Sequence, residues 1–201
     1  MISVVIPTLN EAALLPATLQ ALQANAAPHE VVVVDAGSAD ATREIATLAG
    51  VSVLVSTHGQ RASQMNLGAR HSRGEGLLFL HADTRLRPDS LVAVERALTR
   101  SGVVGGAFAR RFDLPSRMVR WSCALADWRG RLTGWFFGDQ AIFVRREAFA
   151  ALSGFREWDV FEDVDFARRL RRRWPDGLGG PADREFRPAI RARPGVAAGV
   201  G

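Results

Sequence analysis

Carboxylate side chains stand where apolar runs end in the first half of the chain. In "LLFLHADTR", residues 77–85, four apolar residues lead directly into His81 and Asp83. In "VVVVDAGSADAT", residues 31–42, an apolar run ends at Asp35 beside a Gly-Ser turn. A carboxylate in that position can accept hydrogen bonds from a ribose hydroxyl or a base N–H, or it can close an Asx-turn on its own backbone. Both stretches raise the question of what their carboxylates face.

The elements that would position these side chains are apolar, β-branched runs that alternate with helix-like stretches. The runs cover 2–6, 31–34, 51–55 and 77–80, and the helix-like stretches cover 11–24, 41–48, 60–71 and 88–99. This alternation predicts an α/β fold with a parallel sheet covered by helices on both faces. Ligands bind such sheets beyond the carboxyl ends of the strands. The polar residues expected to meet at that edge are Asn10, Glu11, Asp35, Asp40, His81 and Asp83. For Asp40, capping of the following helix is the favoured interpretation.

The second half of the chain has a looser pattern. The stretch 103–112 predicts a strand that its glycines bend, and 162–174 predicts a strongly basic helix. One helical stripe between them is formed at spacings of four, three and four by Trp121, Leu125, Trp128 and Leu132. The stripe suits packing on the sheet, a homodimer interface, or peripheral contact with an anionic membrane surface.

Composition narrows the class of protein. The 201 residues are enough for one domain with a substantial core. The net charge is +5, but the chain has no helix-turn-helix, zinc ligand set or aromatic RNA-binding motif, so no nucleic-acid partner is expected. No apolar run reaches the roughly 18 residues of a membrane span. With the single cysteine Cys123 and no secretory signal at the start, we expect a cytoplasmic protein.

Residues 175–201 follow no period and consist mainly of Gly, Pro, Ala and Arg. The composition predicts a disordered or atypical tail. An alternative hypothesis is that a frameshift or truncation in the coding sequence replaced the original end of the protein.

Four stretches occur in a family-specific order: "SVVIPTLNEAALL", "VVVVDAGSADAT", "LLFLHADTR" and "FEDVDFARRL". Over about residues 1–174 the chain resembles family 2 glycosyltransferases, which have the GT-A nucleotide-diphospho-sugar transferase fold. Within that family it looks most similar to a bacterial subgroup with "HADT" and "GDQAIF" segments, often labelled arsenosugar-biosynthesis type. The resemblance implies a Rossmann-like, mostly parallel sheet flanked by helices. It also implies one domain, 1–174, with a nucleotide-binding half at 1–101 and an acceptor half at 102–174.

The resemblance also implies roles for the residues that would hold the donor. The residues placed near the nucleoside are Pro7, Thr8, Asn10, Glu11 and Asp35. Arg61 would approach the diphosphate, since anions favour Arg and helix N-termini, with Asn66 near it or supporting the turn. A basic, solvated face is the other interpretation of that helix. The donor expected is a UDP- or GDP-sugar.

A divalent cation, Mn²⁺ or Mg²⁺, is the cofactor that the resemblance implies, and Asp83 suits it as an oxygen ligand. The family's metal motif is Asp-x-Asp, and here His81 takes the first position. His81 could ligate Mn²⁺ or donate a hydrogen bond to a phosphate. The substitution removes one negative charge, which weakens the expected metal affinity.

The reaction implied is sugar transfer, with inversion, to a hydroxyl acceptor, including a lipid-linked one. Asp163 would be the general base and Glu162 the reserve candidate, while Asp139 and Gln140 would contact sugar or acceptor. Two alternatives stay open. One is a nucleotide-sugar-binding module without turnover. The other is a sugar nucleotidyltransferase, although its Gly-rich, Lys-containing signature after the first strand is absent.

Overall fold

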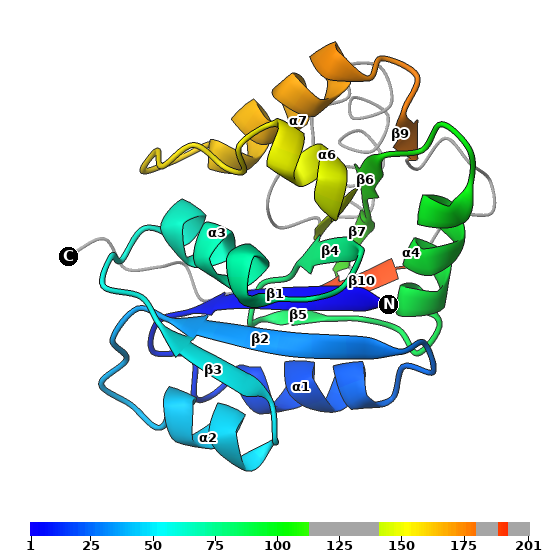
Figure 1. The fold of residues 1–201 in the computed structure, drawn as a ribbon. Helices are drawn as coiled ribbons and strands as arrows, with labels where there is room; N and C mark the ends of the chain where they lie inside the picture. The colour runs from blue at the N-terminus through cyan, green and yellow to red at the C-terminus, as the bar shows by residue number, and fades with distance from the viewer. Residues whose placement is uncertain (113–140, 180–188, 193–201) are drawn as a thin grey trace.

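The computed structural model of the chain describes residues 1–112, 141–179 and 189–192 (Figure 1). Asp139, Gln140 and the tryptophan stripe of 121–132 lie outside these ranges. The helices are α1 (Leu15–Gln23), α2 (Thr42–Leu48), α3 (Arg61–His71), α4 (Ser90–Thr99), α6 (Arg146–Ala151) and α7 (Glu162–Arg173). The strands are β1 (Ile2–Thr8), β2 (His29–Asp35), β3 (Ser52–Val55), β4 (Gly76–Phe79), β5 (Thr84–Arg85), β6 (Gly105–Ala107), β7 (Ala109–Phe112), β8 (Ile142–Arg145), β9 (Leu178–Gly179) and β10 (Ala189–Ala192).

The main sheet has seven strands in the order β3-β2-β1-β4-β8-β6-β9. Strands β1 to β4 are parallel, as the apolar runs and their helical crossovers predict. β8 is antiparallel to both β4 and β6, so the sheet is mixed in its second half. Both predicted halves of the chain therefore contribute to a single sheet.

The register of the parallel strands brings the predicted site residues to one edge. Thr8 at the end of β1 pairs with Asp35 at the end of β2. On the other side of β1, Val5 pairs with Phe79 of β4. Because the register continues beyond the last pair, His81 follows β4 at about the level where β1 ends. The prediction of a shared polar edge is confirmed for these strand ends.

Helices cover both faces of the main sheet (Figure 1), and an apolar cluster lies on each face. Residues alternate along β1, so Val4 and Ile6 pack with α1, α2 and α4, while Val5 packs with α3, α6 and α7. Within the second of these clusters, Phe79 packs against Phe149 and Phe155, with ring centroids 5.1 and 4.8 Å apart. This aromatic cluster fixes α6 and the segment before α7 on the same face as α3, so that α3 and α7 face each other.

Three elements differ from the sequence-based expectation. The first helix begins at Leu15 instead of residue 11, because the backbone N–H groups of Glu11 and Ala12 are bonded to the side chains of Thr42, at the start of α2, and Asp40, in the loop before it. The predicted bent strand at 103–112 is divided at the buried Phe108 into β6 and β7, which join different sheets.

The segment predicted to lack regular structure also contributes strands. β9 pairs with β6, and β10 joins β5 and β7 in a three-stranded sheet. A sheet edge offers unpaired N–H and C=O groups to any extended backbone, so pairing there needs no hydrophobic period. Composition alone therefore missed these two strands.

Candidate active site

A pocket between α3, α7 and the end of β4 brings together four residues predicted from the sequence. They are Arg61, His81, Glu162 and Asp163. Apolar side chains of Met65, Phe79, Ile142 and Phe155 complete its lining. The pocket therefore combines a cation, an imidazole and two carboxylates in partly apolar surroundings, where charges interact more strongly than in water.

Arg61 and Glu162 form an ion pair across this pocket, with 3.6 Å between Nη1 and Oε1. Glu162 is only 4% exposed. Burial is the main cause that raises the pKa of Glu162 above its ordinary value of 4.5, and the Asp163 charge adds to it, while Arg61 and a backbone hydrogen bond oppose the rise. The Arg61 side chain is 53% exposed, so much of its guanidinium remains accessible to a ligand.

The first turn of α7 carries three acidic residues, and their environments differ. Asp165 is held by Arg169, at 2.6 Å, and by Arg156, at 3.3 Å, so its charge is compensated within the protein. Asp163 is half-buried, and its Oδ1 accepts a hydrogen bond from the Val164 N–H at 2.7 Å. Of the three, only Glu162 and Asp163 line the pocket, as predicted.

Asp83 lies at the tip of a tight turn after β4. The Thr84 N–H bonds to the His81 carbonyl at 3.1 Å, and the Thr18 hydroxyl bonds to the Ala82 carbonyl at 2.6 Å, which fixes the turn. Asp83 itself is exposed and accepts a hydrogen bond from the Thr84 hydroxyl at 3.1 Å. Its carboxylate is thus held by rigid neighbours yet accessible to a ligand.

Charged side chains at the polar edge of the sheet change the pKa of Glu11. Burial raises the pKa of Glu11 above its ordinary 4.5, and the charges of Asp83 and Asp40 raise it further, against the lowering effect of Arg61. Carboxylates that repel one another in this way favour a cation between them. Within residues 1–112, 141–179 and 189–192, no group of three or more His, Cys, Asp and Glu side chains forms a preassembled metal site. An exposed carboxylate such as that of Asp83 still fits a cation such as Mg²⁺, which is commonly held by one or two carboxylates and a substrate's phosphates.

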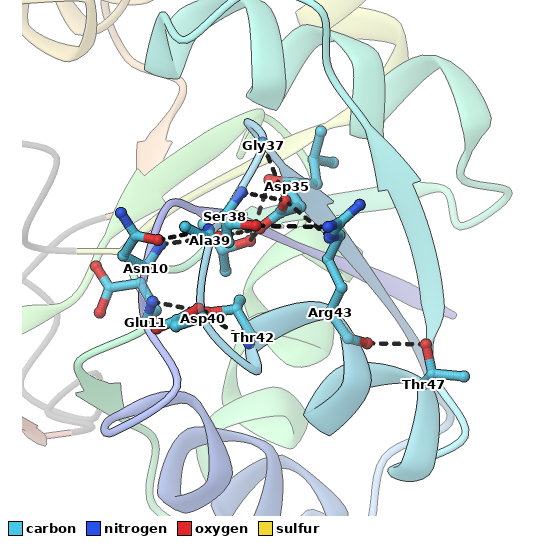
Figure 2. A network of polar contacts seen from close by, with 12 residues as sticks. Asn10, Glu11, Asp35, Gly37, Ser38, Ala39, Asp40, Thr42, Arg43 and Thr47 are labelled. Atoms are coloured by element: carbon cyan, nitrogen blue, oxygen red, sulfur yellow. Dashed lines mark hydrogen bonds and ion pairs between the residues drawn. The ribbon is translucent and has the colours of Figure 1, made fainter.

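Asp35 is fully buried and organises the turn after β2 (Figure 2). Its Oδ1 accepts hydrogen bonds from the N–H groups of Gly37 and Ser38, at 3.0 and 2.8 Å. Its Oδ2 accepts the hydroxyls of Ser38 and Thr8, and Arg43 lies 3.7 Å away. The Asx-turn interpretation is confirmed. Contact of Asp35 or Thr8 with a nucleoside stays a prediction, because both side chains already have partners within the protein.

The loop after β1 is attached to the same turn. Asn10 takes a φ of 57°, in which its N–H bonds to the Ser38 hydroxyl and its Oδ1 accepts the Ala39 N–H. Asp40 Oδ1 accepts the Thr42 N–H at 3.0 Å, but the N-cap residue of α2 is Ala41, so Asp40 bonds the first turn from one residue before the predicted cap position. Figure 2 shows the Glu11 carboxylate directed away from this network.

Asn66 lies in α3, but its amide is used inside the protein. Its Nδ2 donates to the Phe155 carbonyl at 2.8 Å, and its Oδ1 accepts the Phe155 N–H at 2.9 Å. This pair of bonds ties α3 to the segment before α7. Asn66 therefore supports the geometry of the pocket, and the structure gives no support to direct contact with a nucleotide.

Gln64 was missed by sequence reasoning. It is buried, and its Nε2 donates to the carbonyls of Thr8, at 2.9 Å, and Val34, at 2.7 Å. These bonds hold α3 against the ends of β1 and β2, where the donor is expected. The sequence does not distinguish Gln64 from the other polar residues of α3, because its burial follows from the packing of the helix on the sheet.

Comparison with known proteins shows to which family the chain belongs. Residues 3–153 match the model of the family described as Glycosyl transferase family 2. The chain belongs to this family. Membership confirms the predicted family and the predicted enzyme class, a glycosyltransferase.

Curated relatives support this assignment. The chain is 33% identical over 178 residues to a PGL/p-HBAD biosynthesis glycosyltransferase of Mycobacterium bovis, covering 83% of this chain and 68% of the relative. It is also 33% identical to an undecaprenyl-phosphate 4-deoxy-4-formamido-L-arabinose transferase of Pseudomonas aeruginosa, covering 80% and 52%. This family 2 glycosyltransferase thus spans about half to two thirds of the length of these proteins.

Solved structures confirm the GT-A fold. The mannosyltransferase PcManGT of Pyrobaculum calidifontis, in complex with GDP-Man and Mn²⁺, superimposes with a TM-score of 0.77 at 22% identity, over 94% of this chain and 56% of that one. TarS of S. aureus in complex with UDP-GlcNAc gives 0.73 at 18% identity, over 97% and 59%. At these identities the likeness concerns the fold.

Proposed function

We propose that this family 2 glycosyltransferase moves a sugar from a nucleoside-diphosphate sugar to an acceptor hydroxyl, with inversion at the anomeric carbon. The observation that carries the proposal is the pocket in which Arg61 stands opposite Glu162 and Asp163. A cation for the leaving diphosphate and a carboxylate for the acceptor proton are what such a transfer needs.

The donor side is formed by the ends of β1, β2 and α3. Arg61 is the first residue of α3, where exposed N–H groups and the helix dipole favour anions. Its planar guanidinium can donate two hydrogen bonds to a diphosphate. The carboxylate of Glu11, directed away from the Asp35 network, is positioned to accept a hydrogen bond from the nucleoside. The solved relatives bind GDP-Man or UDP-GlcNAc, which supports a GDP- or UDP-sugar donor.

Asp83 would hold the divalent cation, with His81 as the second candidate. The accessible carboxylate of Asp83 and its repulsion of Glu11 support a cation at this edge, as does the Mn²⁺ of PcManGT. A bound Mn²⁺ or Mg²⁺ supplies charge neutralisation for the departing diphosphate.

Asp163 is the general base in this proposal. The acceptor oxygen bonds to the anomeric carbon, its proton passes to Asp163, and the bond from that carbon to the diphosphate breaks with its electron pair leaving on the nucleoside diphosphate. Glu162 suits the base less well, because Arg61 already pairs with it and it is buried. Asp139 and Gln140 stay predictions for the sugar or acceptor.

The acceptor proposed is lipid-linked and is met at the cytoplasmic face of a membrane. The support is the named substrate of the Pseudomonas relative, an undecaprenyl phosphate. Within the described ranges, no helix has the length and apolarity to span a bilayer, so the contact proposed is peripheral. The arsenosugar-type subgroup and a homodimer stay predictions from the sequence.

Product analysis tests the function against its two alternatives. The purified chain is incubated with GDP- or UDP-sugars and Mn²⁺, and we expect release of nucleoside diphosphate. Pyrophosphate release from a nucleoside triphosphate and a sugar phosphate would instead indicate a nucleotidyltransferase. Donor binding in a thermal-shift assay without either product would indicate a binding module.

A further inference from the structure

Three large apolar side chains are exposed within four consecutive residues before α7. Trp158 is 48% exposed, Val160 64% and Phe161 63%. We call residues 156–161 the apolar ridge. In Figure 1 the segment that contains it projects beyond α6 and α7, on the side of the start of α3. Contiguous exposed side chains of this size mark interaction surfaces more often than plain solvent-facing loops.

The apolar ridge is anchored to the rest of the protein. The Gln60 side chain donates to Asp159 Oδ1 at 2.7 Å. One residue before the ridge, Phe155 is held at both backbone polar groups by Asn66. Phe161 takes a φ of 65°, a backbone conformation that costs energy for a bulky residue. Its side chain is nevertheless exposed to solvent. The ridge is therefore a preformed surface.

The apolar ridge leads directly into the pocket. Phe161 is the N-cap residue of α7, and the next two residues, Glu162 and Asp163, line the pocket. A partner that covers Phe161 thus lies next to the candidate base.

The charges of the apolar ridge are of both signs. The Arg156 guanidinium lies over the Trp158 ring, 5.7 Å from its centroid, and also pairs with Asp165 of α7. Glu157 and Asp159 are exposed and flank Trp158 in the chain. One guanidinium and two carboxylates around an indole match a headgroup that carries both a phosphate and an ammonium group. They do not favour a purely anionic surface, because the carboxylates would repel it.

We propose that the apolar ridge docks on a zwitterionic lipid bilayer, with Trp158, Val160 and Phe161 in the interfacial layer. Arg156 donates to lipid phosphates, and Glu157 and Asp159 face the ammonium groups. The role of this docking, to bring the pocket to a lipid-linked acceptor, rests on the proposed function; the docking itself does not. It differs from the predicted contact of the 121–132 stripe, which requires anionic lipid.

Vesicle flotation tests the proposal with the full chain. The vesicles contain phosphatidylcholine and phosphatidylethanolamine, at about 0.05 M and about 0.5 M NaCl, which screen exposed charges to different extents. We expect the chain to float at both salt concentrations, because apolar contact dominates. The variant W158T/V160T/F161N should lose about tenfold or more of the floating fraction. Asn is chosen at 161 because it tolerates positive φ.

The matched control is L48T/V55T, which removes two exposed apolar side chains, 80% and 57% exposed, from α2 and the end of β3. α2 lies across the main sheet from α7, and β3 is the edge strand of that sheet at the end away from β8 and β6 (Figure 1). The control should float like the wild type, and circular dichroism should show both variants folded.

Three outcomes overturn the proposal. The first is a ridge variant that floats as well as the wild type. The second is binding that requires phosphatidylglycerol and is lost at high salt, which would show that basic residues carry it. The third is a wild type that does not bind vesicles and dimerises through the ridge, which would make a second copy the occupant. The docking proposal and the proposed function can fail separately. A chain that floats but releases no nucleoside diphosphate supports membrane docking and contradicts sugar transfer.

Discussion

Arg61 and Glu162, which begin α3 and α7, pair at 3.6 Å across the candidate active site. The pair joins the group expected to bind the diphosphate to the buried carboxylate beside the candidate base. A donor that takes hydrogen bonds from Arg61 therefore changes the electrostatic environment of both acids at the start of α7.

Ionisation of the buried Glu162 makes the free energy of unfolding of the protein depend on pH. Its pKa is raised in the folded state, so between the unfolded and folded pKa values the folded protein binds more protons. Stability from this group is present below the unfolded pKa and is lost as the pH rises through the folded one. Glu162→Gln cannot ionise. We expect the free energy of unfolding of this variant to increase relative to that of wild type as the pH rises above 4.5, the ordinary pKa of the group, as urea titrations would measure.

A Glu162→Gln variant whose stability relative to wild type does not vary with pH would contradict a raised pKa. Glu147→Gln is a suitable control, because Glu147 is exposed and lies 3.9 Å from its ion-pair partner Arg145.

Asp83→Ala should abolish the Mn²⁺-dependent part of stabilisation by nucleoside diphosphates. A ligand at about 100 times its Kd stabilises a protein by about 2.7 kcal/mol, which a thermal-shift assay detects. The fold should be intact, since Asp83 is exposed. Asp89→Ala, at an exposed residue paired with Arg87, is the control and should keep the full response. A normal Mn²⁺ response in Asp83→Ala would remove Asp83 as the ligand.

Asp163→Asn should lower turnover by about 10²–10⁴ while donor affinity changes little, because the amide keeps the size of the side chain and loses the basic oxygen. Single-turnover kinetics and donor titration separate the two quantities. Glu162→Gln should lose less turnover. The reverse order of losses would make Glu162 the base.

Asn66→Ala should destabilise the protein by about 1–3 kcal/mol, because the N–H and C=O of Phe155 lose their partners. Gly154→Ala should also destabilise, since Gly154 has a φ of 71° and a Cβ there would lie 2.5 Å from Asn66 Oδ1. Urea denaturation measures both changes. If Asn66→Ala instead kept wild-type stability and lost donor affinity, a direct contact with the nucleotide would be the better assignment.

Local sequence determined the first half of the fold and the positions of its polar strand ends. Burial on both faces produces continuous apolar strands, and helical crossovers make those strands parallel, so residues as far apart as Asn10 and Asp83 could be assigned to one edge. The roles proposed for Asp83 and Asp163 rest on motifs in the order that the family resemblance implies. The Asx-turn at Asp35 was one of two interpretations that the sequence left open, because such turns depend only on adjacent residues.

Tertiary structure alone decided how those groups are used. Arg61 meets Glu162, Asn66 meets Phe155 and Gln60 meets Asp159 across about 90–100 residues of chain, and no local period encodes such contacts. Burial, which raises the pKa of Glu162, depends on the packing of α3, β4 and α7 together. Exposure of Trp158, Val160 and Phe161 is equally a property of the assembled fold, because an apolar residue in sequence indicates burial until its neighbours in space are known.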